Sequence, residues 1–253
     1  MLKTRVIPCL LLSNGGLVKT VKFSNPKYIG DPINAVRIFN EKEVDELVFL
    51  DIDATKNNSS PNFELLGRIS SEAFMPFSYG GGIKSLDQVK KLFALGVEKV
   101  VINSAAIEDN KLISDIAKMA GSSSTVVSID VHQNVFGKYI IKSRSGTRKS
   151  KLNLIDYVKT AEDSGAGEIL LNSINRDGLK NGYDLKTLKL VANTVNIPVV
   201  PLGGAGSLID MRDAVNCGAS AVAAGSFFVF HGAHKAVLIT YPQYEVMESI
   251  FND

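Results

Sequence analysis

Short apolar runs alternate along the chain with longer segments in which apolar residues recur at helical spacing. The runs are RVIPCLL at 5–11, ELVFLD at 46–51, MPFSYG at 75–80, EKVVIN at 98–103, TVVSID at 125–130, EILLNS at 168–173, IPVVPL at 197–202 and SAVAAG at 220–225. Segments such as 85–96 and 184–195 begin with Ser or Asp, which are common helix N-caps. Eight strand-then-helix units in 253 residues predict a (β/α)8 TIM barrel. A doubly wound open sheet remains the alternative, because alternation alone does not show that the sheet closes.

The first apolar run, Val6 to Leu12, is interrupted by Pro8 and ends at the turn residues 13–16. This pattern favours a buried strand over a secretory signal. No apolar run approaches the roughly 20 residues that span a bilayer, and Cys9 and Cys217 form neither a disulfide framework nor a metal-ligand pattern. We therefore expect a cytoplasmic protein. A net charge of +2 argues against nucleic acid as the main partner.

An internal repeat joins the two halves of the chain. Glu46 and Glu168, Gly82 and Gly204, Gly96 and Gly218, Asn103 and Gly225, and Ser104 and Ser226 are each separated by 122 residues. The repeat predicts a single barrel domain, residues 1–253, built from half-barrels at roughly 1–121 and 122–253. Each half is then expected to offer the same kind of ligand site.

Glycine-rich segments follow two of the predicted strands, GGGI at 80–83 and GGAGS at 203–207. The next strand in each half ends at Asn103-Ser104 or at Gly225-Ser226. Glycine lets backbone N–H groups approach an anion, and hydroxyl groups add further donors. Glycine at a tight turn is often only a steric necessity, but the pattern occurs in both halves and therefore favours a ligand with a phosphate at each end.

Many collinear motifs resemble HisF, the cyclase subunit of imidazole glycerol phosphate synthase in histidine biosynthesis. They are RVIPCL, GDP at 30–32, DELVFLDI, GGGI, VEKVVIN, AGEILLNSINRDG, NGYD, NIPVVPLGGAG and AAGS. The resemblance implies a TIM barrel that binds the bis-phosphate PRFAR at its C-terminal face, without a cofactor. It also implies a HisH-like glutaminase at the opposite face, which sends ammonia through the barrel.

The resemblance assigns phosphate and substrate contacts residue by residue. The first anion site comprises Gly82, Asn103 and Ser104, and the second anion site comprises Gly178, Gly204, Gly225 and Ser226. Lys19, expected in the loop after the first strand, matches a substrate-contacting lysine of the family, although a solvated loop charge is the alternative.

The family closes the N-terminal end of its barrel with four charged residues, which are Arg5, Glu46, Lys99 and Glu168 in this chain. Inward-facing charges of balanced sign can pair, whereas an unmatched buried charge is costly. The resemblance thus implies an ammonia gate, and we call these four residues the charged layer.

The family uses two aspartates as general acid and base. Asp130 matches one of them, but Leu11 occupies the position of the other. Loss of such a group typically removes a factor of about 10² to 10⁴ in rate. Asp51, Asp53 or Asp177 could compensate only by reaching the same face of the substrate.

Three functions remain open at this point. A specialised HisF paralogue could pass ammonia to a sugar amidotransferase for amidination of a bacterial surface-sugar precursor. An ordinary cyclase-lyase would convert PRFAR to imidazole glycerol phosphate and AICAR. A non-catalytic scaffold would only activate the glutaminase.

Two further features are not covered by these functions. The basic segment SRSGTRKSK at 143–151 follows a predicted hairpin strand, and it fits a solvated turn as well as a phosphate or partner contact. His132, His231 and His234 lack nearby carboxylates or thiols in a ligand pattern, so we expect no metal.

Overall fold

The computed structural model describes residues 4–232 and 234–252, so the ends of the two predicted half-barrels, residues 1–3 and 253, lie outside the described residues. All eight predicted strands are present. They are β1 (Arg5–Ser13), β4 (Leu47–Asp51), β5 (Phe77–Gly80), β6 (Lys99–Ile102), β7 (Thr125–Gln133), β10 (Glu168–Ser173), β11 (Val199–Leu202) and β12 (Ala221–Ala224).

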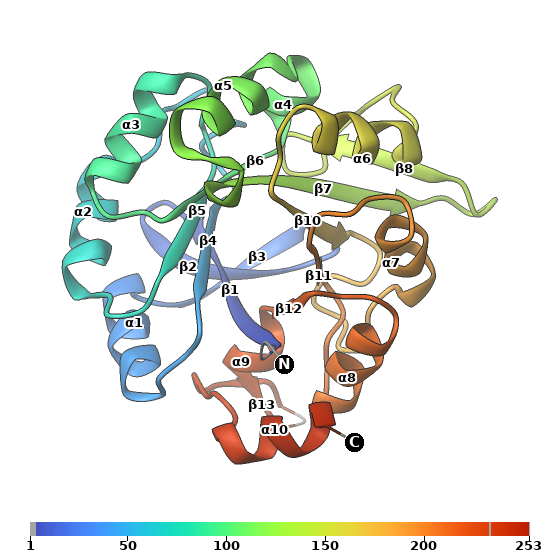
Figure 1. The fold of residues 1–253 in the computed structure, drawn as a ribbon. Helices are drawn as coiled ribbons and strands as arrows, with labels where there is room; N and C mark the ends of the chain where they lie inside the picture. Colours follow the sequence, from blue (N-terminus) through green and yellow to red (C-terminus); the bar gives the residue numbers. More distant parts are fainter. Residues whose placement is uncertain (1–3, 233, 253) are drawn as a thin grey trace.

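The eight strands close into a barrel. Neighbours are parallel in the order β11-β10-β7-β6-β5-β4-β1, and β12 pairs with the other side of β1, with Arg5 opposite Ala221. At the remaining junction, Ser220 N donates to Val199 O over 3.0 Å. The strands form a central ring surrounded by helices (Figure 1). The predicted (β/α)8 TIM barrel is therefore confirmed, and the open sheet is excluded.

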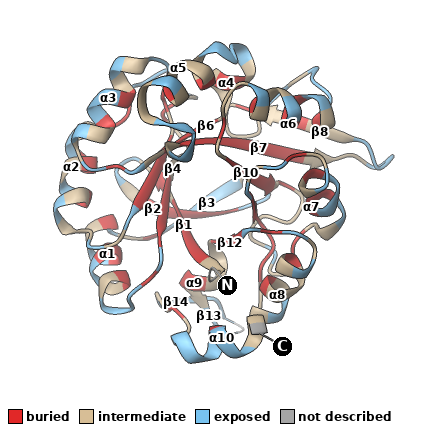
Figure 2. Cartoon of the chain, viewed as in Figure 1, coloured by how far each residue is buried: buried red, intermediate tan, exposed pale blue. Residues whose placement is uncertain are grey.

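Helices connect successive strands around the outside. They are α1 (Pro32–Glu41), α2 (Phe63–Glu72), α3 (Leu86–Ala94), α4 (Ser104–Glu108), α5 (Lys111–Ala120), α6 (Leu154–Asp163), α7 (Leu185–Ala192), α8 (Leu208–Asn216), α9 (Ser226–Val229) and α10 (Tyr244–Asn252), with a short 3₁₀ turn, η1 (Ser122–Ser124). Ser85 and Ser207 begin α3 and α8 with capping boxes, which satisfy N–H groups that the first turn leaves unpaired. The faces that contact the barrel are buried and the outer faces are exposed (Figure 2).

The 122-residue repeat recurs in the bounds of the elements. The offset relates β5 to β11, α3 to α8 and β6 to β12 at both ends of each element. The capping-box serines, Ser85 and Ser207, have the same separation. Equivalent segments of the two halves therefore begin and end at equivalent sequence positions.

The barrel strands separate two apolar clusters. On β1, Val6, Leu10 and Leu12 belong to the larger cluster that includes the helices. The alternate residues of β1 pack in a second cluster, because successive strand side chains point to opposite faces of a sheet. This interior cluster comprises Ile7, Cys9, Val48, Val101, Val126, Leu170, Val200, Leu202, Ala221 and Ala223, with Leu11 and Leu50 packed against it.

Hairpins extend two barrel strands beyond the barrel. β2 (Gly16–Val21) and β3 (Ser24–Gly30) follow β1, while β8 (Tyr139–Ser143) and β9 (Arg148–Lys149) follow β7. The expected loop position of Lys19 is wrong, because Lys19 lies on β2. Asn14 and Gly15, with φ of 49° and 77°, make a tight turn that pairs β2 antiparallel with β1.

The C-terminal part of the described chain contains a small hairpin of β13 (Phe230–His231) and β14 (Ala236–Val237). In residues 4–232 and 234–252, no helix has the length and apolar character to cross a membrane.

Candidate functional site

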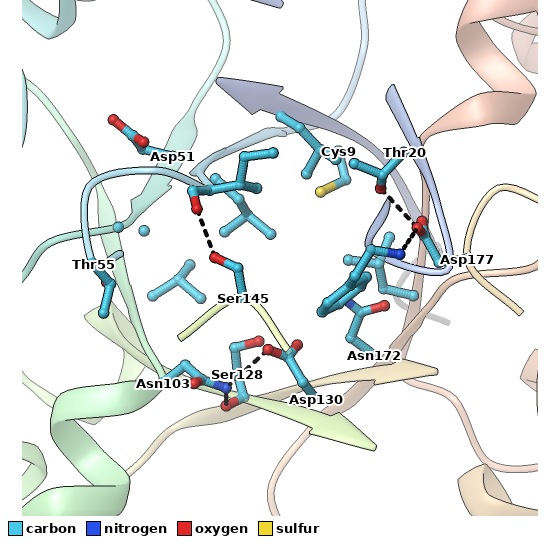
Figure 3. Close-up of a pocket in the computed structure, with 18 of the residues that line it drawn as sticks. Cys9, Thr20, Asp51, Thr55, Asn103, Ser128, Asp130, Ser145, Asn172 and Asp177 are labelled. Atoms are coloured by element: carbon cyan, nitrogen blue, oxygen red, sulfur yellow. Dashed lines mark hydrogen bonds between the residues drawn. The ribbon is translucent and has the colours of Figure 1, made fainter. Parts of the chain in front are cut away.

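A cavity of about 310 Å³ lies at the C-terminal ends of the barrel strands. The strand ends, the connecting loops and the two hairpins surround it (Figure 3). Its lining includes every residue that the sequence assigned to substrate, phosphate or acid-base chemistry, namely Leu11, Lys19, Gly82, Asn103, Ser104, Asp130, Gly178, Gly204, Gly225 and Ser226. The fold thus brings both anion sites to one cavity, although their phosphate-binding roles stay predictions.

Local hydrogen bonds link the residues of the first anion site to neighbouring loops. Gly82 N donates to Thr55 Oγ1 over 3.3 Å. Ser104 Oγ accepts from Arg144 N at 2.9 Å and donates to Asn103 Oδ1 at 3.3 Å. An anion at this site would compete with Thr55 for the Gly82 N–H group.

Close packing requires glycine in the second anion site. A Cβ atom on Gly178 would lie 2.3 Å from Thr20 O, and one on Gly204 would lie 2.1 Å from Gly182 O. Both residues also have positive φ, 72° and 111°. Steric need by itself therefore accounts for these two glycines.

Lys19 is buried next to the second anion site. Its Nζ donates to Cys9 O over 2.5 Å, and a Cβ atom on Gly225 would lie 2.2 Å from the same Nζ. Burial lowers the pKa of Lys19, while Cys9 and Asp177 act in the opposite direction. The position predicted as a substrate contact thus holds an amine in the cavity wall.

Asp130 is a buried titratable group of the cavity. It lies on the inward face of β7, is 8% exposed, and accepts a hydrogen bond from Asn103 Nδ2 at 3.3 Å. Burial raises the pKa of Asp130 to about 7, helped by the charge of Asp177 and opposed by a hydrogen bond from Asn172. A carboxyl group with this pKa can both donate and accept a proton near neutral pH.

Leu11 contributes an apolar side chain to the same cavity from β1. Of the alternatives considered, Asp51 and Asp177 line the cavity, while Asp53 is not among the lining residues and accepts from Ser13 Oγ at 2.6 Å. Leu11 itself can neither donate nor accept a proton.

Asp51 and Asp177, two further carboxylates of the cavity, are held by local hydrogen bonds. Asp177 Oδ2 accepts from Thr20 Oγ1 at 2.7 Å and from Phe23 N at 3.0 Å. Asp51 Oδ1 accepts from the backbone N–H groups of Asp53 and Ala54, each at 2.9 Å. Burial raises the pKa of Asp51 and of Asp177. Each carboxylate therefore already accepts hydrogen bonds that hold a neighbouring segment in place.

The charged layer forms one network at the opposite end of the barrel. Arg5 donates to Glu46 and, over 2.6 Å, to Glu168. Lys99 Nζ lies 3.0 Å from Glu46 and 3.6 Å from Glu168. Burial favours the neutral form of Arg5, but the two glutamates outweigh it and raise its pKa. Each cation therefore contacts both anions.

Sequence reasoning missed several cavity residues, including Thr55, Ser145 and Asn172. Ser145 Oγ donates to Ile52 O at 2.6 Å and links two loops that line the cavity (Figure 3). Asn172 is buried, and its Oδ1 has no hydrogen-bond partner among the described residues. Its inward position at the end of a predicted strand was the available signal.

The two cysteines and three histidines do not form a metal site among the described residues. Cys9 is buried, Cys217 is half-buried, and both are free thiols. Within the described ranges 4–232 and 234–252, no group of three or more His, Cys, Asp and Glu side chains could hold a metal ion.

Comparison with known proteins places the chain in a family. The family model described as histidine biosynthesis protein matches residues 5–235. The chain is 54% identical over 244 residues to a Pseudomonas aeruginosa protein provisionally named imidazole glycerol phosphate synthase subunit hisF2, covering 96% of this chain and 97% of that protein. It is 51% identical over 253 residues to a provisionally named HisF subunit of Leptospira interrogans, covering 99% and 100%.

A Streptomyces coelicolor protein named imidazole glycerol phosphate synthase subunit HisF is 40% identical over 229 residues, which cover 90% of this chain and 91% of that protein. The family match and these near full-length similarities agree with the motifs, the closed barrel and the shared cavity. The chain therefore belongs to the histidine biosynthesis protein family, as a member of its HisF group.

Proposed function

We propose that this chain is the synthase subunit of a glutamine amidotransferase complex, which receives ammonia from a HisH-like glutaminase and passes it on. The observation that carries this proposal is the charged layer beneath an apolar barrel interior. A neutral ammonia molecule enters an apolar interior far more readily than ammonium, because an unpaired ion there is costly. The interior cluster, which includes Ile7, Val48 and Leu170, suits that selectivity.

Leu11 determines which reaction we expect in the cavity at the C-terminal end of the barrel. The cavity keeps Asp130 but has leucine at the second acid-base position, so we expect PRFAR cyclisation to be impaired. Ammonia then serves another acceptor, and amidination of a bacterial surface-sugar precursor by a separate amidotransferase is the reaction that we propose. The chain would contribute the ammonia route and the docking surface for the glutaminase.

A second candidate is the ordinary cyclase-lyase that converts PRFAR to imidazole glycerol phosphate and AICAR. The cavity favours it by keeping both predicted anion sites together with Asp130. The names of the relatives, which describe imidazole glycerol phosphate synthase subunits, also favour it. Activity with PRFAR decides between the two candidates.

The docking of the glutaminase can be tested by sedimentation with the cognate subunit and a glutamine analogue. We expect a complex that is weakened by Glu98→Arg, because Glu98 is exposed next to Lys99 at the start of β6. Lys56→Glu is the matched control, since Lys56 is exposed at the cavity end. Absence of any complex contradicts the ammonia-transfer function.

The acceptor can be identified with amide-¹⁵N-labelled glutamine. The proposal predicts glutamine hydrolysis with little label in imidazole glycerol phosphate when PRFAR is supplied, and label in the acetamidino product when the sugar amidotransferase and its N-acetylated substrate are supplied. Efficient labelling of imidazole glycerol phosphate would instead establish the cyclase. Glutaminase activation without transfer to either acceptor would indicate the scaffold.

A further inference from the structure

The two hairpins at the cavity are related by the same 122-residue offset as the barrel. The β2–β3 turn has Lys22 and Phe23 at φ of 51° and 61°, and the segment after β8 has Arg144 and Ser145 at φ of 52° and 53°. Lys22 and Arg144 are 122 positions apart, as are Phe23 and Ser145. Equivalent segments of the two halves thus share an uncommon backbone conformation.

Each turn contacts the equivalent loop of the opposite half. Lys22 N donates to Asp177 O at 3.0 Å, and Arg144 NH2 donates to Thr55 O at 3.1 Å. Positions 55 and 177 are again separated by 122 residues. The two hairpins also meet, because a Cβ atom on Gly146 would lie 2.9 Å from Phe23 Cδ2.

The chemistry of the two contacts differs. In one half, the buried Asp177 carboxylate accepts the backbone N–H of Phe23. In the other half, an arginine side chain makes the contact, and Arg144 lines the cavity together with Gly82 and Ser104. The 122-residue offset therefore relates two turns that differ in chemistry. Arg144 adds a cation to the cavity wall, whereas the equivalent turn at Lys22 and Phe23 is held by the Asp177 carboxylate.

Arg144 has donors to spare at the first anion site. Guanidinium presents five N–H donors in a planar fork, and among the described residues only Thr55 O accepts from the Arg144 guanidinium. Its backbone N–H contacts Ser104 Oγ, while Thr55 Oγ1 accepts from Gly82 N. Glu108, a carboxylate of the cavity lining, is paired with Arg148 at 3.0 Å.

We propose that Arg144 is a ligand-binding residue, whose guanidinium holds a phosphate or similar oxyanion at the first anion site while Thr55 O positions it. Two parallel N–H···O bonds to one oxyanion suit the guanidinium fork. The inference rests on the proposed phosphate-bearing ligand, but it requires neither the glutaminase nor ammonia. Failure of one proposal is therefore distinguishable from failure of the other.

The test is a titration of the protein with inorganic phosphate, followed by NMR through the backbone amides of Gly82 and Gly204. These amides report separately on the first and the second anion site. Arg144→Gln is expected to weaken the phosphate response of Gly82 about ten-fold or more, because charge-assisted hydrogen bonds are lost. The response of Gly204 should stay unchanged and shows that the variant is folded.

Two further variants separate charge from geometry. Lys149→Gln removes a charge from the same hairpin, at an exposed residue outside the cavity lining, and should leave both responses unchanged. Arg144→Lys should recover only part of the affinity, because lysine lacks the fork. The proposal is overturned if the Gly82 response is absent in the unmodified protein, is unaffected by Arg144→Gln, or falls equally at both sites.

Discussion

Asn103 Nδ2 donates to Asp130 Oδ2 over 3.3 Å, so a residue predicted to contact phosphate holds the carboxyl group that is predicted to act as acid and base. Asn103 directly follows β6, and Asp130 lies on the neighbouring strand β7, so both residues line the cavity. The predicted ligand binding at the first anion site and the predicted proton transfer at Asp130 would therefore be connected through one amide side chain. This contact places the predicted phosphate site beside the predicted acid-base residue, while β1 has Leu11 at the position of the second carboxylate.

The buried Asp130 predicts a specific pH dependence of stability. With a pKa of about 7, native Asp130 keeps a proton that the unfolded chain releases near pH 4, so its contribution to stability falls as pH rises from about 4 to 7. Asp130→Asn removes this effect. Relative to the unmodified protein, the free energy of unfolding of the variant should rise by about 1–4 kcal/mol between pH 4 and pH 8. Urea unfolding across this range measures the difference.

The matched control for this experiment is Asp163→Asn, at an exposed residue that ends α6. The difference in the free energy of unfolding between Asp163→Asn and the unmodified protein should change little from pH 4 to pH 8. If this difference is equally independent of pH for Asp130→Asn, then Asp130 is not protonated in the native state at pH 6.

The charged layer predicts a large effect of removing one member. Arg5→Met leaves Lys99 as the one cation of the charged layer beside Glu46 and Glu168, and both glutamates are nearly buried. We expect the free energy of unfolding to fall by about 2–4 kcal/mol, because stranded buried charges are costly. Adding Glu168→Gln should restore part of the loss, since it restores the balance of charge.

A surface pair provides the comparison for Arg5. Arg37 pairs with Glu72 at 2.9 Å, but its side chain is 61% exposed. Arg37→Met should change the free energy of unfolding by less than about 1 kcal/mol in urea denaturation. Equal effects at Arg5 and Arg37 would show that the charged layer is fully solvated.

Leu11→Asp should increase PRFAR cyclase activity with ammonium salts above a low level in the unmodified chain. The variant supplies the missing second proton-transfer group in the cavity that contains Asp130, and such a group typically contributes a factor of about 10² to 10⁴. The increase is measured as the steady-state rate of imidazole glycerol phosphate formation by Leu11→Asp and by the unmodified chain.

Leu50→Asp is the control for Leu11→Asp, because Leu50 lies opposite Leu11 in the β1–β4 pairing and also lines the cavity. A carboxylate there should give no comparable gain. Turnover by the unmodified chain at rates usual for the family would make the expected impairment wrong and would assign the chain to the ordinary cyclases.

Gly225→Ala should destabilise the protein through Lys19. The new Cβ would lie 2.2 Å from Lys19 Nζ, so the amine must leave its hydrogen bond to Cys9 O. We expect a loss of about 1–3 kcal/mol in thermal or urea unfolding. In a Lys19→Met background the same substitution should cost less, because the amine that must move is gone.

Gly67→Ala is a contrasting control in α2, where a Cβ would meet its nearest neighbour, Leu95 Cδ2, at 3.6 Å. It should stabilise the helix by roughly 0.5–1 kcal/mol. Equal costs of Gly225→Ala with and without Lys19 would show that the backbone, and not the lysine, sets the steric limit.

Sequence patterns predicted the strands well because strand formation here depends on local apolar runs. The predicted run at 168–173 is β10 without a change of bounds. The run at 46–51 begins one residue before β4, and the run at 98–103 extends one residue beyond β6 at each end. The turn residues 13–16 were predicted to close the first strand, and β1 does end at Ser13, but the hairpin that continues into β2 was not predicted. Asn14-Gly15 was the signal for that hairpin, since both residues tolerate positive φ.

The sequence by itself thus determined the strand-helix order, the 122-residue repeat and, through family motifs, which residues are candidates for the site. Only the tertiary structure decided that Arg144 contacts Thr55, which is 89 positions away, and that Asn103 contacts Asp130. It also decided that Lys19 is buried against Cys9 O and not solvated in a loop. The physical reason is that apolar periodicity acts over a few neighbouring residues, whereas barrel closure and hairpin packing determine which distant side chains meet.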